Sequence, residues 1–268
     1  MRRLLITLLF YLSISFCIGQ EIPYYNRMLG KYYSPLKVDF SKEYLELQTK
    51  RHINFQDQLQ QSLNYDFSSI WLTNDDQQNG IIGFNYQRIQ IHISKVSKDI
   101  NTPDTYFVKG KSKVNNNICD FSGEIKLIRL LYVNYKGAEV EYDLFATYLF
   151  YEDSTQNESG VFKGTMECAV HLDSTKTKMI LDEFMVGADG YWNRTFVGTW
   201  TNYKTNDSKK CIWGDYRLPF TFDFDCGDGE LMVCDKYVNN GWKTFNGGLE
   251  YIIVGNEREL KDKWWIKK

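Results

Sequence analysis

The densest group of side chains able to hold a ligand lies between residues 191 and 217. Aromatic rings supply apolar contact area there, and guanidinium groups supply directed charge. This mixture is typical of a site that binds a small apolar or sugar-like molecule. The candidate ligand-binding residues are Trp192, Arg194, Trp200, Trp213, Tyr216 and Arg217. The alternative is that these aromatic residues only fill a core.

A Gly-x-Trp element, Gly198-Thr-Trp200, lies within this stretch. It resembles the Gly-x-Trp element of lipocalin-like and avidin-like barrels, in which a tryptophan packs at one end of the barrel, often beneath an arginine. The resemblance implies a similar architecture, with Arg217 stacking on Trp200 or Trp213.

The sequence contains no catalytic signature. It has three histidines and no H-E-x-x-H, G-x-S-x-G or P-loop motif. Glu139, Glu141 and Asp143 alternate along a predicted strand, opposite to its apolar face, which indicates a solvated surface. A glycosidase needs two carboxyl groups across a cleft, so a secreted carboxylate-dependent hydrolase is only the third hypothesis. We therefore predict a binding protein rather than an enzyme, with no catalytic residue and no cofactor.

Residues 223–230 form an acidic, glycine-rich loop. An EF-hand that began at Asp223 would need a ligand at its fifth position and glycine at its sixth, but Gly227 and Asp228 stand there. A solvated turn is favoured, and a looser calcium site is the alternative. No metal-binding residue is predicted.

Five cysteines remain if the first 19 residues are removed. They are Cys119, Cys168, Cys211, Cys226 and Cys234. An odd number cannot all pair within one chain. One disulfide among the last three is expected in an oxidising compartment, with the pairing left open. None of the spacings is C-x-x-C, so no zinc site is expected.

The elements that must position these residues are strands. The pattern Phe-x-Gly-x-apolar occurs at 121–125, 162–166 and 196–200. Side chains at i and i+2 share one face of a strand, so each Phe and each Gly should point inward. An inward glycine permits a sharp bend or a close backbone approach. The repeated pattern predicts a sheet that curls into a barrel.

Eight strands are predicted, joined by short polar loops. Their approximate ranges are 81–97, 106–114, 119–133, 139–151, 162–172, 179–186, 191–204 and 209–218. Short loops imply antiparallel neighbours, and eight such strands can close into an up-and-down barrel. The fold class is therefore all-β. A barrel of this size is either filled by its own side chains or holds one small ligand. The alternating Lys109, Lys111 and Lys113 indicate a solvated outer face.

The chain divides into four parts. A signal peptide is predicted at 1–19, because a basic start precedes a short apolar run and small residues at Cys17 and Gly19. Residues 20–80 form an N-terminal extension whose pattern predicts no clear structure, and residues 81–218 form the barrel. Residues 219–268 form a C-terminal extension with the acidic loop and a short terminal helix, begun by Asn256 with Glu259 as its capping-box partner.

Export to the periplasm, the cell envelope or the medium follows, with cleavage near Gly19–Gln20. No transmembrane span is predicted, because the only apolar run is too short. The net charge of −2 gives no sign of the excess positive charge that is typical of nucleic-acid-binding proteins. The first functional hypothesis is a barrel that binds a small apolar or sugar-like ligand in its mouth. The second is a packed structural or interaction protein of the cell envelope with a protein partner.

Overall fold

The computed structural model describes residues 24–26, 31–51, 56–133, 142–183, 190–245, 250–254 and 257–266. The predicted signal peptide at 1–19 lies outside the described residues.

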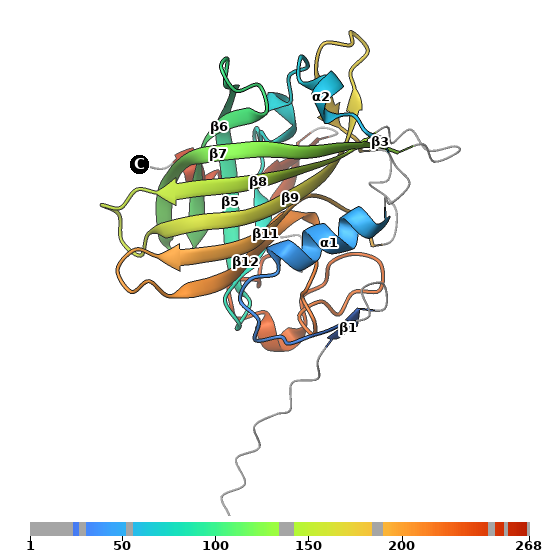
Figure 1. Ribbon diagram of the computed structural model, residues 1–268. Helices are drawn as coiled ribbons and strands as arrows, with labels where there is room; N and C mark the ends of the chain where they lie inside the picture. The colour runs from blue at the N-terminus through green and yellow to red at the C-terminus, as the bar shows by residue number, and fades with distance from the viewer. Residues whose placement is uncertain are drawn as a thin grey trace, which may run out of the picture.

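Eight strands close into an antiparallel β-barrel (Figure 1). In chain order they are β4 (Gln78–Ile82), β5 (Gln87–Lys98), β6 (Thr105–Val114), β7 (Asn117–Tyr132), β8 (Tyr142–Glu152), β9 (Gly160–Leu172), β11 (Trp192–Asn202) and β12 (Ser208–Tyr216). Each pairs with the next, and β12 returns to β4 with Cys211 opposite Ile82. The predicted all-β, up-and-down barrel is confirmed.

Two of the eight predicted strands differ from the observed ones. The range 81–97 holds two strands, β4 and β5, separated by a turn in which Gly83 and Tyr86 have positive φ. Within the described part of the range 179–186, which ends at residue 183, the strand is β10 (Met179–Leu181), and it pairs with the end of β9 outside the ring. The alternating apolar pattern did not reveal β4 as a separate strand, because Ile81 and Ile82 are both buried, one on each side of the barrel wall. The total of eight is correct because these two errors offset each other.

The glycines of the Phe-x-Gly repeats lie where the neighbouring strand approaches them closely. Gly164 stands opposite Gly198 across β9 and β11, and Gly123 stands opposite Phe150. A Cβ at Gly164 would lie 2.2 Å from the carbonyl oxygen of Val197. No side chain fits there, so the prediction of a close inward approach is confirmed.

Stacked rings fill the barrel interior. The rings of Phe196 and Trp213 stack with centroids 4.8 Å apart, and Tyr148 meets Trp213 edge-on at 5.1 Å. The end opposite the β8–β9 turn is closed by residues 59–71, which hold α2 (Leu59–Ser62) and η1 (Ser68–Ile70). Trp71 in this segment is buried and packs edge-on against Tyr106 at 4.9 Å. The barrel is therefore a packed core.

A second hydrophobic core lies outside the barrel wall. Helix α1 (Ser41–Arg51) crosses the outer face of β9 and β11, and residues 218–245, which include η2 (Asp235–Tyr237), pack beside it (Figure 1). Buried residues from both segments meet the outward side chains of Ile81, Val197 and Ile212. The short hairpin of β1 (Tyr24–Asn26) and β2 (Lys31–Tyr33) precedes α1, and β3 (Gln56–Asp57) adds to the edge of β7.

The C-terminal residues cover another part of the wall. They form a hairpin of β13 (Tyr251–Val254) and β14 (Glu257–Leu260), followed by the single 3-10 turn η3 (Trp264–Ile266). In the described C-terminal residues, the predicted terminal helix is present only as this turn. Glu259 pairs with Ile252 in the hairpin, so its expected role in a capping box is wrong, and Asn256 lies outside the described residues. Trp265 stacks on His92 of β5 at 4.1 Å, so the tryptophan pair docks on the barrel as expected.

Candidate functional site

Two predicted ligand-binding residues, Trp213 and Trp200, are part of the barrel core. Trp213 is fully buried between Phe196 and Tyr148. Trp200 is 6% exposed, and its indole nitrogen donates a 2.8 Å hydrogen bond to Oε2 of Glu152. Both rings serve packing in this structure, which agrees with the alternative of a filled core.

Glu152 is a buried carboxylate that the sequence did not single out. It accepts hydrogen bonds from the Ser112 hydroxyl, the Trp200 indole and the Gly160 amide. Burial raises the pKa of Glu152, although these hydrogen bonds oppose the shift. Glu152 follows Phe150 by two residues and therefore lies on the same inward face of β8. This alternation is the sequence signal that could have predicted its burial. Its three donors make it a structural anchor for Trp200.

Arg194 lies at the other end of β11, in a partly buried ion pair. Its guanidinium donates to both carboxylate oxygens of Asp215, at 2.5 and 3.1 Å, and to the Leu72 carbonyl at 2.9 Å. Burial lowers the pKa of Arg194, but the charge and hydrogen bonds of Asp215 outweigh this effect, so the pKa lies above its ordinary value. The pair ties β11 and β12 to the segment that closes the barrel end.

Trp192 and Tyr216 form an aromatic rim above this pair. They stand opposite each other in register and are 38% and 50% exposed. Tyr191 lies 5.0 Å from the Tyr216 ring. Trp200 is eight residues farther along the same strand, about 26 Å away. The structure thus brings Trp192, Arg194 and Tyr216 together but separates them from Trp200.

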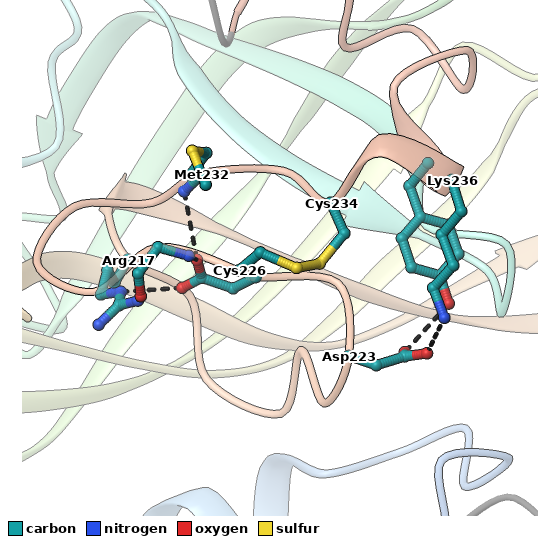
Figure 2. Close-up of a disulfide and its surroundings, with 9 residues drawn as sticks. Arg217, Asp223, Cys226, Met232, Cys234 and Lys236 are labelled. Carbon is teal, nitrogen blue, oxygen red and sulfur yellow. Dashed lines mark hydrogen bonds and ion pairs between the residues drawn. A yellow bond between two sulfur atoms is a disulfide. The ribbon is translucent and has the colours of Figure 1, made fainter.

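Arg217 does not stack on Trp200 or Trp213. Its guanidinium donates to Asp225 at 2.8 Å (Figure 2) and also to the carbonyls of Gly227 and Asp228. The predicted stacking is therefore wrong. The acidic loop begins only a few residues after β12, so its acceptors lie within reach of the Arg217 guanidinium.

The acidic loop is held together by its own contacts. Asp225 also accepts the amides of Gly227 and Met232, at 2.9 and 3.2 Å, while Asp223 pairs with Lys236 (Figure 2). A disulfide between Cys226 and Cys234 closes the loop, which resolves the open pairing. Cys119, Cys168 and Cys211 are free and buried. No cluster of three or more His, Cys, Asp or Glu side chains suited to a metal ion occurs among the described residues.

The strongest candidate site is a groove of about 480 Å³ on the outer face of strands β5 to β8. None of the described terminal segments contributes to its lining. Its walls are two rows of outward side chains in cross-strand register, one of Ser97, Phe107, Glu124 and Leu149 and the other of Lys95, Lys109, Ser122 and Tyr151. Phe107 and Tyr151 are half-exposed, at 50% and 49%. The groove therefore combines two accessible rings with charged groups.

A β-bulge at Ser94 shapes one wall of this groove. Ile93 points into the barrel, and regular alternation would turn Lys95 inward as well. The register shifts between Ile93 and Lys95, so Lys95 points outward and stands opposite Lys109. The groove could not be predicted from the sequence, because the bulge interrupts the alternation of inward and outward side chains along β5.

No family model, no curated protein and no solved structure matches this chain. In the part of the chain that the structure describes, no helix has the length and apolar character needed to cross a membrane.

Proposed function

We propose that this protein is an exported, non-enzymatic binding protein that holds a small ligand on the outside of a filled barrel. The observation that carries the proposal is the groove over β5 to β8, flanked by the accessible rings of Phe107 and Tyr151. Its volume lies in the range of roughly 300–1,000 Å³ that is typical of small-molecule sites. The proposed ligand site therefore lies on the outer face of the barrel, and not at the barrel mouth near Trp200, where it was expected from the sequence.

A small ligand suits this groove better than a protein partner. A stable protein interface buries about 800 Å² on each partner, usually across a broad surface. Peptide binding by strand addition needs an exposed sheet edge, whereas every barrel strand is paired on both sides. The packed interaction protein of the cell envelope is the alternative, and the filled interior is compatible with both.

Ligand binding can be tested by titrating the purified protein with a panel of neutral and acidic oligosaccharides, followed by NMR or calorimetry. Phe107→Ala and Tyr151→Ala should each weaken binding, because each removes a ring from the groove. Tyr132→Ala is the matched control, since Tyr132 is 41% exposed on β7 and does not line the groove. Binding that ignores Phe107 and Tyr151, or a panel without any binder, would overturn the proposal and favour the interaction protein.

Export is supported by the Cys226–Cys234 disulfide, because such bonds persist in oxidising compartments. N-terminal sequencing of the protein recovered outside the cytoplasm tests it. A chain that begins at Gln20 is expected, and an intact Met1 would contradict export by a cleaved signal.

A further inference from the structure

The groove carries two lysines that face each other. Lys95 and Lys109 are directly opposite across β5 and β6, and only the bulge at Ser94 places them there. Like charges at directly opposed positions destabilise a sheet. A bulge is a built feature that re-aims side chains, often beside functional sites. An anionic group between the two ammonium groups would relieve this repulsion.

Two neighbouring lysines, on strands β6 and β7, lie close to carboxylates that offset their positive charge. Lys111 pairs with Asp120 at 3.5 Å, and Lys126 lies 3.9 Å from Asp104. Within the described residues, neither Lys95 nor Lys109 has such an ion pair. Lys95 and Lys109 therefore bring positive charge to the groove without a paired carboxylate among the described residues.

The opposite wall limits what the anion can be. Glu124 faces the groove from β7, beside Leu149 of β8. A densely charged polyanion would be repelled by Glu124, whereas a ligand with one carboxylate and several hydroxyls fits both walls. Its carboxylate would meet the lysines, and its hydroxyls would donate to Glu124.

The two rings set the length of the ligand. Phe107 and Tyr151 are two strands and two residues apart, which separates their backbone positions by about 12 Å. This distance exceeds a single sugar ring. Sugar rings present C–H faces that pack on aromatic side chains and hydroxyls at their edges.

We propose that the groove binds an oligosaccharide of carboxylated sugars, with a carboxylate between Lys95 and Lys109 and ring faces on Phe107 and Tyr151. This inference rests on the proposed function, because it names the ligand class of the same groove.

The test compares a galacturonic acid trisaccharide with its carboxyl-reduced neutral counterpart. The acidic form should bind about tenfold more tightly at low salt, and the difference should shrink at high salt. Lys95→Gln and Lys109→Gln should each remove most of this difference. Lys111→Gln is the matched control, because Lys111 is paired with Asp120 and does not line the groove. Circular dichroism and thermal unfolding confirm that each variant is folded.

The outcomes separate the two proposals. Equal binding of both trisaccharides, still weakened by Phe107→Ala, overturns the carboxylate and leaves the groove as a binding site. Tighter acidic binding that survives in both lysine variants places the anion elsewhere and also overturns it. If neither trisaccharide binds, the carboxylated-sugar proposal fails; if in addition no member of the wider oligosaccharide panel binds, the proposed function fails with it.

Discussion

The hydroxyl of Tyr148 lies over Gly164 and Gly198, 2.8 and 2.7 Å from where their Cβ atoms would stand. The two glycines face each other across β9 and β11, so their missing side chains make room for one aromatic ring from β8. The barrel interior is filled here because the Tyr148 ring occupies the space that two side chains would otherwise take.

Replacing Gly164 by valine should destabilise the protein by about 3 kcal/mol, because the new side chain has no space. Its Cβ alone would meet the Val197 carbonyl and the Tyr148 hydroxyl. Urea unfolding measures the loss. Thr147→Val, at an exposed position of β8, is the control and should change little. A Gly164→Val protein as stable as its parent would show that the Tyr148 ring can move aside.

Replacing Tyr148 by phenylalanine should leave stability unchanged or raise it by about 1 kcal/mol. The Tyr148 hydroxyl is buried and has no hydrogen-bond partner among the described residues. Tyr44→Phe is the matched comparison, because the Tyr44 hydroxyl donates a 2.6 Å bond to Glu167 and its loss should cost about 2 kcal/mol. Equal losses in both variants would reveal a bound partner for Tyr148.

Glu152 should make stability fall as the pH rises above 4.5. Burial raises its pKa above this ordinary value, so the folded protein holds the proton more tightly than the unfolded chain. The stabilisation is present below 4.5 and is lost as the pH passes through the folded pKa. Urea unfolding at a series of pH values should therefore give a flatter profile for Glu152→Gln than for the parent. The exposed Glu124→Gln serves as control, and parallel parent and Glu152→Gln profiles would refute the assignment.

Removing the disulfide by the double change Cys226→Ser and Cys234→Ser should cost about 2 kcal/mol. The bond closes a loop between residues eight apart, which restricts the unfolded chain. A reducing agent should lower the unfolding midpoint of the parent to that of the variant and leave the variant unchanged. A parent that is insensitive to reductant would contradict a stabilising bond.

The barrel could be predicted because its strands alternate regularly between core and surface. The pattern failed where local geometry departs from alternation, as at β4 and at the Ser94 bulge. Trp200 was expected on the inward face, two residues after Gly198, but sequence could not show whether rings or a ligand would fill the space beside it. The contact of Arg194 with the Leu72 carbonyl could not be predicted, because Leu72 is distant in sequence and lies in the extension for which the pattern predicts no clear structure.

The closure of the barrel between β4 and β12 has a consequence for how the chain folds. This seam joins the first and last barrel strands, which are far apart in the sequence, and such long-range pairing is slow. The ammonium of Lys210 beside the seam lies 5.9 Å from the ring of Phe40 and 5.3 Å from that of Phe222. These rings come from before and after the barrel, so the Lys210 contacts join both extensions to the seam. We expect these contacts to form late in folding, and contacts made after the transition state govern the rate of unfolding rather than the rate of folding.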